Sequence, residues 1–527
     1  MTRIWLLLVV LITCIPQYAY AQIELGGDAR VNPEDFDITV FADGLNYPLG
    51  MAELEDGSIL AAVSNGTTFF GSANGELIRL ADTNGDGIAD EETVLVESVP
   101  GGALTTVRTA GELVFTTGQG KPISIYRFAD SPTSSLDYLG DITITYAGGW
   151  LHPHSTLAAQ PTPGIENSID LYFQLGSSEN FAITTRTLEL TSSIGVSATL
   201  VGDAIHRIRI ADDGTTISAS EVELIATGLR NATGLIFHPD TGDMYIAENG
   251  IDGLMDPNEP HSADELNLLV ATDIGSSIQD FGFPSTFEAY RTQEQVGSAG
   301  IFPLVSFQPL PDPMTGSESE GPNDIALAPS SFPAGLNNGV FVTFHGKFFL
   351  GGIENEENPL VYVDLETFEY FHIISNELPD VGHLDGLLAT EDALYISDIS
   401  PQGGFGNGTA NTGVIYRVAP VQVDNTNTES PETPVTSLLT NASVYPNPSR
   451  GRITIEFDTQ PGIPSEVTII DMLGRTIKTF STLPNTQEQH LTWDGNNENG
   501  LPVGSGTYLL SIRQAHQSST TLFSILN

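Results

Sequence analysis

One pattern recurs six times between residues 40 and 418: a short apolar run, a turn with Asp, Asn or Gly, and a second hydrophobic strand. The copies span residues 49–60, 104–115, 155–173, 233–246, 324–342 and 385–396. Few segments show the period of a helix, so short strands dominate the chain. A repeated strand pair predicts radially arranged sheets, because that arrangement protects the sheet edges. The sequence therefore predicts an all-β fold with a six-bladed β-propeller over residues 22–419.

The chain changes character after the sixth copy. Residues 420–440 are polar, rich in Pro and Thr, and without hydrophobic periodicity, which is typical of a linker. Residues 441–527 then show short strand patterns separated by turn signals. Strands of this kind over such a length suit an immunoglobulin-like β-sandwich. We therefore expect a propeller and a C-terminal sandwich joined by a linker.

The first residues have the pattern of a secretory signal peptide. Arg3 precedes an apolar run over residues 4–15, and an Ala-Tyr-Ala cleavage site ends at Ala21. We expect removal of residues 1–21. A lipoprotein is the alternative, because Cys14 follows a short apolar run, but Thr is unfavourable directly before a lipidated cysteine. Cys14 is the only cysteine, so the mature chain forms no disulfide.

Acidic residues greatly outnumber basic ones: 67 Asp and Glu against 18 Lys and Arg, for a formal net charge of −49. This field repels nucleic acid and anionic lipid surfaces, so we expect neither a nucleic-acid partner nor membrane insertion. The self-repulsion destabilises a compact state unless salt or bound cations screen it. The acidic residues are scattered, which favours a halophilic protein over one rich in divalent-cation sites.

One acidic loop, residues 82–92 (DTNGDGIADEE), has the pattern of a calcium site. Oxygen ligands at alternate positions, with Gly where the loop turns sharply, suit a hard cation such as Ca²⁺. The expected ligands are the side chains of Asp82, Asn84, Asp86 and Asp90 and the carbonyl of Ile88. The alternative is a surface hairpin rich in Asx turns.

A second group of polar residues flanks the fourth repeat. Arg230 and Asn231 precede its first strand, Glu248 ends its second strand, and Asp264 follows after an insertion. Arg can bind a carboxylate through two parallel hydrogen bonds, and carboxylates are suitable ligands for a hard metal ion. The alternative is that Arg230 and Asn231 only fix a loop while the acids lie on a solvated rim.

Two histidines, His152 and His154, stand before the strand of the third repeat. Residues two apart in an extended segment face the same side, so both rings could bind one metal. Alternatively, one ring could act as a base while the other packs, or both could be structural. His345, Lys347 and His383 stand at comparable points of later repeats. In a propeller five side chains could meet at one end, as an anion-binding and proton-handling pocket: His152, Arg230, His345, Lys347 and His383.

The C-terminal unit resembles the sorting domain of type IX secretion substrates. The resemblance is carried by residues 444–451 (VYPNPSRG), 470–475 (IDMLGR) and 504–508 (GSGTY), in the order found in the family. It implies a partnership with the type IX secretion machinery and passage across an outer membrane. The expected location is therefore outside the cell or on its surface.

Residues 35–418 resemble the glucose/sorbosone dehydrogenase family. The resemblance is carried by residues 152–157 (HPHSTL), 175–180 (LGSSEN), 228–231 (GLRN), 264–267 (DELN) and 344–347 (FHGK). It implies a six-bladed propeller that uses pyrroloquinoline quinone and Ca²⁺ to oxidise an aldose or related sugar. Where many members place an arginine in the last blade, this chain has Gly382-His383-Leu384-Asp385.

The same resemblance implies a role for each matched residue. His152 would be the base that takes the proton of a sugar hydroxyl. The implied cofactor-binding residues are Arg230, Asn231, Lys347 and His383, and the implied metal-binding residues are Glu248 and Asp264. Two alternatives stay open: a Ca²⁺-dependent lactonase-like hydrolase, and a non-catalytic surface propeller that binds glycan or protein.

Overall fold

The computed structural model describes two compact units, which divide between residues 422 and 423. The described residues of the first unit are 23–421, apart from 130–134, 255–258, 377, 380 and 406–407. Those of the second are 443–525, apart from 448, 450, 459–464, 472–474, 483–487, 498–499, 505 and 515–516. The predicted signal peptide and almost all of the predicted linker lie outside these residues. No helix among the described residues has the length and hydropathy needed to cross a membrane.

The first unit contains six antiparallel sheets of at least four strands among its described residues. The first sheet comprises β2 (Met51–Glu53), β3 (Ile59–Ser64), β4 (Asn74–Ala81) and β5 (Glu91–Pro100). The second comprises β6 (Leu104–Ala110), β7 (Leu113–Gly118), β8 (Ile123–Phe128) and β9 (Leu136–Thr145), extended by β12 (Thr187–Ser192) and β13 (Ser197–Val201). The third comprises β10 (Leu157–Pro161), β11 (Ser168–Leu175), β14 (Ala204–Asp212) and β15 (Ile217–Thr227), to which β19 (Gln279–Asp280) adds in parallel.

The later sheets follow the same plan. The fourth comprises β16 (Ala232–Phe237), β17 (Met244–Glu248), β18 (Asp264–Leu269) and β22 (Val305–Phe307). The fifth comprises β23 (Pro322–Leu327), β24 (Gly339–Phe344), β25 (Leu360–Asp364) and β26 (Tyr370–Ile374). The sixth comprises β27 (Leu384–Ala389), β28 (Leu394–Asp398), β29 (Gly413–Pro420) and β1 (Phe36–Leu45). Smaller elements are the hairpin of β20 (Phe287–Glu288) and β21 (Gln295–Val296) and the 3₁₀ turns η1 (Pro33–Asp35) and η2 (Gly352–Glu354).

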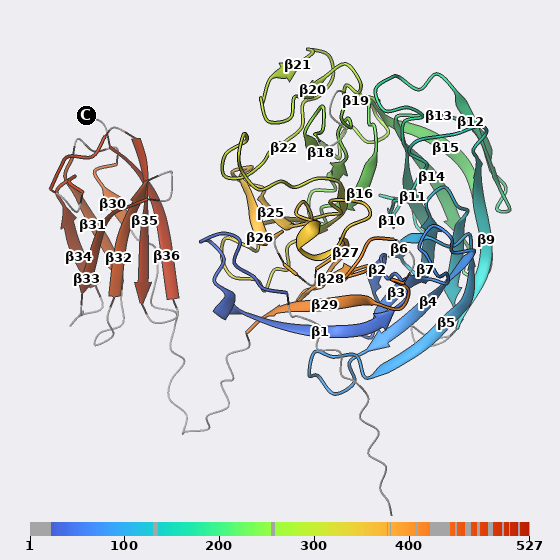
Figure 1. Ribbon diagram of the computed structural model, residues 1–527, viewed down its shortest axis with the longest axis horizontal. Coiled ribbons are helices and arrows are strands. Elements are labelled where there is room, and N and C mark those ends of the chain that lie inside the picture. Colours follow the sequence, from blue (N-terminus) through green and yellow to red (C-terminus); the bar gives the residue numbers. More distant parts are fainter. Residues whose placement is uncertain are drawn as a thin grey trace, which may run out of the picture. The chain divides into compact units, whose positions relative to one another are not determined.

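The innermost strands of the six sheets close into a ring. Each of β2, β6, β10, β16, β23 and β27 contacts the innermost strand of the next sheet, and β27 contacts β2 again. The sixth sheet closes the ring by combining β1 with three strands from the far end of the unit, and Figure 1 shows β1 beside β29. The unit is therefore a β-propeller whose six sheets are its blades, and each sequence repeat supplies the two innermost strands of one blade.

The second strand of every blade is buried along its whole length, which explains its continuous hydrophobic sequence. The hydrophobic core lies between neighbouring blades. Phe115 of the second blade, for example, shares a core with Phe173 and Ile208 of the third. Because adjacent blades share their apolar faces, a single blade has no core of its own.

The strand directions give the ring two distinct ends. We call the end at which the innermost strands begin the front end, and the other the back end. Each second strand runs back to the front end, so the loops before the first and after the second strand of every blade meet there. The back end opens into a cavity of about 540 Å³, lined by residues of all six innermost strands, among them Glu53, Arg108 and Phe237.

The second unit consists of two antiparallel sheets around one core. One sheet has the order β30 (Ser443–Tyr445), β31 (Ile453–Asp458), β34 (Glu488–Trp493). The other has the order β33 (Thr476–Thr482), β32 (Ser465–Asp471), β35 (Gly506–Gln514), β36 (Gln517–Ile525). Side chains of both sheets, including Ile455, Trp493, Leu510 and Phe523, form the shared core. Its immunoglobulin-like character remains a prediction from the sequence.

Candidate functional site

The front end of the propeller gathers most of the residues that the sequence singles out. His152, Arg230, Asn231 and His383 lie just before first strands, and Glu248 ends a second strand. Lys347 lies in the loop that follows β24. These loops belong to four consecutive blades, so the repeat itself brings them to the same end.

Arg230 is almost fully buried, with 1% of its surface exposed. Its Nη2 donates to Asn180 Oδ1 at 2.8 Å and contacts Asp252 Oδ2 at 2.6 Å, while its Nε donates to the Asn180 carbonyl at 3.1 Å. Its backbone amide donates to the Glu248 carboxylate. Arg230 thus joins the loops of the third and fourth blades, and its one ion-pair partner among the described residues, Asp252, is 66% exposed at the side chain.

Asn231 links the fourth blade to the fifth through a second amide. Its Nδ2 donates to Asn249 Oδ1 at 2.9 Å, and Asn249 Nδ2 donates to the Pro322 carbonyl at 2.7 Å. Both side chains are therefore engaged in holding the loops together.

Three carboxylic acids of the fourth blade have unusually high pKa values. Glu248 and Glu265 face each other across neighbouring strands, and Asn267 Nδ2 donates to both, at 3.0 and 3.1 Å. Burial raises the pKa of Glu265 to about 7, and burial together with Glu265 raises that of Glu248 well above its usual range. Burial also raises the pKa of Asp264 to about 7, although the amides of Gly250 and Gly321 donate to its two oxygens. Crowded, desolvated acids of this kind bind either protons or a cation.

His152 and His154 occupy different environments. The Nε2 atom of His152 is buried without a hydrogen-bond partner, and burial together with the charge of Arg230 lowers its pKa to about 3. His154 uses both ring nitrogens: Nδ1 contacts Tyr146 Oη at 2.7 Å and Nε2 contacts the Lys121 carbonyl at 2.8 Å. The pair therefore does not share a metal in this arrangement.

Lys347 and His383 are held by side chains and backbone of the fifth and sixth blades. Lys347 Nζ lies 2.5 Å from Glu356 and 3.4 Å from Glu357. His383 is fully buried, and its Nδ1 lies 2.7 Å from the His345 carbonyl. Burial, and next the neighbouring His345, lowers the pKa of His383 to about 3, so its ring is neutral.

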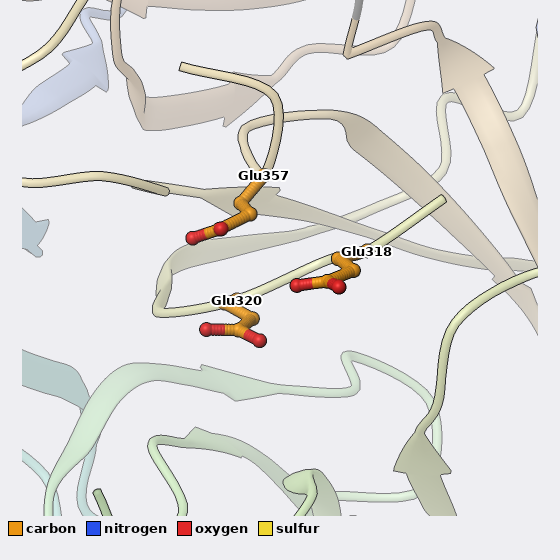
Figure 2. Close-up of side chains that lie close together, drawn as sticks. All are labelled: Glu318, Glu320 and Glu357. Atoms are coloured by element: carbon orange, nitrogen blue, oxygen red, sulfur yellow. The ribbon is translucent and has the colours of Figure 1, made fainter. Parts of the chain in front are cut away.

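An acidic cluster that the sequence analysis did not single out also lies at the front end. Among the described residues, Glu318, Glu320 and Glu357 bring one carboxylate oxygen each within 4.8 Å of the others, and Figure 2 shows their side chains converging. Burial, and next Glu357, raises the pKa of Glu320 to about 10. Two of the acids have basic partners, since Glu318 pairs with Arg291 and Glu357 with Lys347.

The acidic loop after β4 lies at the back end, away from the other candidates, because β4 runs from the front end to the back. Asp82 accepts backbone amides of four loop residues, including Gly85 at 2.6 Å and Gly87 at 2.7 Å. Asn84 and Asp86 accept amides two residues further on, and Asp90 accepts the Thr83 hydroxyl at 2.8 Å. These bonds shape the loop whose Ca²⁺ ligation, including that by the Ile88 carbonyl, remains a prediction.

Some partners of the site residues had only weak signals in the sequence. Glu318 and Glu320 are two apart in an extended segment, a spacing that places them on one side, but Glu357 comes from a distant loop. Asn180 contacts Arg230 only because the third and fourth blades are neighbours, whereas Asp252 contacts it from another loop of the fourth blade. Such contacts depend on how the strands assemble and not on local spacing.

Several solved structures resemble the chain at low identity. The calcium structure of a Trichoderma reesei enzyme of Carbohydrate-Active Enzymes Family AA12 is 16% identical, covers 77% of this chain and 98% of its own, and has a TM-score of 0.48. The holo form of the pyranose dehydrogenase PQQ domain from Coprinopsis cinerea is 14% identical, covers 77% and 98%, and has a TM-score of 0.47. A putative oxidoreductase (glucose dehydrogenase) from Thermus thermophilus is 17% identical, covers 73% and 99%, and has a TM-score of 0.43.

One curated relative matches part of the chain. It is an uncharacterized protein of Borreliella burgdorferi, 28% identical over 153 residues, which are 28% of this chain and 34% of that protein. The chain thus spans about a third of the length of the curated relative it matches.

The C-terminal unit has a family match. Residues 443–525 match the family model of the secretion system C-terminal sorting domain. This range contains all three sequence blocks on which the resemblance rests. The chain therefore carries a sorting domain of the type IX secretion system and is exported across the outer membrane to the surface or the exterior.

Proposed function

We propose that the propeller is an exported, calcium-dependent sugar dehydrogenase of the quinoprotein type, acting on an aldose or a related sugar. The observation that carries the proposal is the meeting of His152, Arg230 and Glu248 at the front end of one propeller. A neutral imidazole with a free Nε2, a buried guanidinium and crowded carboxylates are the groups that oxidation of an alcohol needs.

Calcium fits the acids of the fourth blade. Glu248, Asp264 and Glu265 supply hard oxygen ligands, and burial raises their pKa values more than the charge of Arg230 and the neighbouring amides lower them. A divalent cation at this place relieves that repulsion and releases protons. The lining of the small cavity beside Arg230 includes Glu248 and Glu265, and its volume of about 20 Å³ has room for a single ion or water.

A quinone that bears carboxylates fits Arg230 and Lys347 if its carboxylates replace the acids that now pair with these two cations. The side chain of Asp252, which pairs with Arg230, is 66% exposed, and that of Glu356, which pairs with Lys347, is 62% exposed. Because the two acids reach solvent, a cofactor carboxylate can take the place of either one beside its cation once calcium offsets the surrounding acids. When bound, the quinone supplies the acceptor for the hydride that leaves the sugar carbon.

His152 then holds the proton of the sugar hydroxyl at Nε2. Burial, and next the charge of Arg230, lowers its pKa to about 3, so the ring is neutral. Its buried Nε2 has no hydrogen-bond partner and is therefore able to accept that proton.

The test is reconstitution of the full chain with Ca²⁺ and pyrroloquinoline quinone, followed by dye reduction with a panel of aldoses. We expect activity that requires both additions and falls at least a hundredfold in His152→Ala, with an unchanged melting temperature. His154→Ala is the less informative variant because His154 packs inside the loop. Full activity in His152→Ala removes the assigned base, and no sugar-dependent reduction with any aldose refutes the proposal.

The cavity volume favours a second candidate, in which the front end binds a cation and does not bind quinone. The roughly 20 Å³ beside Arg230 suits an ion and not a tricyclic cofactor in this arrangement. Such a propeller would hydrolyse sugar lactones at the metal or bind glycan without turnover. Calcium binding without any change in the quinone spectrum supports this candidate. An assay of lactone hydrolysis then distinguishes a hydrolase from a propeller that only binds glycan.

A further inference from the structure

Three rings and one carboxylate form a compact group between the fifth and sixth blades, which we call the histidine cluster: His345, His383, Phe405 and Asp385. The rings of His345 and His383 are stacked with centroids 4.2 Å apart, and Phe405 lies parallel to both, at 4.8 and 5.2 Å. His345 Nδ1 lies 2.7 Å from Asp385 Oδ1. Asp385 and His383 are fully buried.

The contacts of His345 fix which of its ring nitrogens carries the proton. A carboxylate oxygen only accepts hydrogen bonds, so the 2.7 Å contact with Asp385 requires Nδ1 of His345 to be the donor. When Nδ1 carries the only ring proton, Nε2 is an acceptor. Burial, and next His345, lowers the pKa of His383 to about 3, so that ring is neutral, and its Nδ1 donates to the His345 carbonyl.

Three atoms of this cluster are buried without a hydrogen-bond partner. They are Nε2 of His345, Nε2 of His383 and Oδ2 of Asp385, all with almost no exposure. A buried acceptor without a partner destabilises the fold, so native structures tolerate it mainly at functional positions. With the ring protons on Nδ1, all three atoms are acceptors.

We propose that His345 and Asp385 bind two hydroxyl groups of a neutral sugar, which donate to Nε2 and Oδ2. This inference deepens the proposed function, on which it rests, by giving the site its substrate-binding pair. A ligand that places a carboxylate here is rejected, because its oxygens accept hydrogen bonds, as do Nε2 of His345 and Oδ2 of Asp385. Asp385 also acts as a positioning residue, since its bond to Nδ1 keeps Nε2 in the accepting state.

The surroundings of the cluster suit a sugar. The ring of Phe348 lies 5.5 Å from that of His345 and is 43% exposed, so an aromatic side chain at the surface borders the histidine cluster. Phe70 of the first blade stacks on Phe348 at 5.4 Å and is also exposed. An apolar face beside hydrogen-bonding groups is the usual composition of a small-molecule site.

The test measures sugar binding to the full chain without calcium or quinone, by saturation-transfer NMR. The probes are glucose, galactose, mannose and xylose, with glucuronate and 2,3,4,6-tetra-O-methyl-glucose as matched controls. We expect at least one neutral aldose to bind. The uronate and the methylated sugar should bind at least tenfold more weakly, the latter because its methylated hydroxyl groups no longer donate hydrogen bonds. Binding of none of the aldoses, or equal binding of the methylated sugar, overturns the inference.

Variants then locate the binding site. Asp385→Asn and His345→Asn are expected to raise the Kd of the bound aldose at least tenfold, while His345→Gln, whose amide can donate to Asp385 and accept from a hydroxyl, retains part of the affinity. Buried residues of the third blade serve as controls: Asp203→Asn and His206→Asn should leave the Kd unchanged. Melting temperatures identify any variant that fails to fold, in which case His345→Gln carries the comparison.

These measurements separate the two proposals. Sugar binding that depends on Asp385 stands even if no quinone activity is reconstituted, because the probes bind to cofactor-free protein. Conversely, reconstituted activity with the same KM in Asp385→Asn as in the wild type refutes the binding pair while the proposed function survives. A high-resolution structure that shows only ordered water on both acceptors at saturating aldose also refutes it.

Discussion

Arg108 and Asp324 lie on opposite blades of the ring and form an ion pair across its axis, with Nη2 and Oδ1 3.0 Å apart. Arg108 belongs to the innermost strand of the second blade and Asp324 to that of the fifth. The other oxygen of Asp324 accepts the amide of Leu387, in the sixth blade, at 3.2 Å. One buried carboxylate therefore connects three blades.

Removing this carboxylate should destabilise the propeller strongly. In Asp324→Ala the Arg108 charge and the Leu387 amide lose their partner, so we expect a loss of about 3–5 kcal/mol in unfolding free energy. Urea denaturation measures it. The control is Asp28→Ala, which breaks the exposed ion pair with Arg30 and should cost at most about 1 kcal/mol. Equal, small losses in both variants contradict the role of the axial pair.

Close packing of the innermost strands leaves no room for a methyl group at Gly386. A Cβ atom there would lie inside van der Waals contact of the Leu49 carbonyl of the first blade and of Ser397 Oγ. We expect Gly386→Ala to destabilise the propeller by about 1–3 kcal/mol. Gly149→Ala, at an exposed position with no atom within 4 Å, should change stability by less than about 0.5 kcal/mol. Thermal unfolding of both variants measures these changes, and equal stability of the two variants contradicts the prediction.

Calcium should stabilise the propeller more at high pH than at low pH. Asp264 and Glu265 have pKa values of about 7, above their unfolded values, so between about pH 4 and 7 the folded state holds more protons than the unfolded one. Deprotonation therefore costs stability as the pH rises through 7, and a cation that neutralises the carboxylates restores it. We expect a small rise in melting temperature with Ca²⁺ at pH 5 and a larger one at pH 8.

Two variants assign that pH dependence. Glu265→Gln should remove the part of the calcium effect that grows with pH. Asp86→Asn, in the back-end loop, should remove the part of the calcium effect that does not change above pH 5. Backbone amides of that loop hold the pKa of Asp82 below its usual range, so Asp82 is already ionised there. A calcium effect that is the same at pH 5 and pH 8 contradicts binding at the front end.

The sorting domain should unfold as a unit of its own. Trp493 is 1% exposed in the core of the second unit, and replacing it with Ala should cost about 3–5 kcal/mol. In a calorimetric scan of the full chain, Trp493→Ala should lower one transition and leave that of the propeller in place, because the two units have separate cores. A shift of both transitions together contradicts this independence.

The repeat predicted the blades because each copy encodes a local feature, an apolar strand buried on both faces with its partner across a short turn. The residues that begin those strands, such as His152 and Arg230, could be placed at one end for the same reason. The hydrogen-bond partners could not be predicted. Arg108 and Asp324 are 216 residues apart and meet only because a six-bladed ring places the second blade opposite the fifth.

The chemical state of the site residues also lay beyond the sequence. His152 and His154 have similar local sequences, yet His154 has both nitrogens bonded while His152 has a free Nε2 beside Arg230. That difference arises from Tyr146, which lies in the same connection between β9 and β10, and from the Lys121 carbonyl, which belongs to the loop between β7 and β8.

The pairing of β1 with β29 also determines when, during synthesis, the propeller can close. Phe36 pairs with Pro420 and Leu45 with Gly413, so the sixth blade consists of β1 alone until nearly the entire propeller has emerged from the ribosome or translocon. No chain that ends before residue 413 can complete the ring. The N-terminal strand therefore waits, unpaired, through the synthesis of five blades, and the sorting domain is the next folded unit to appear after closure becomes possible.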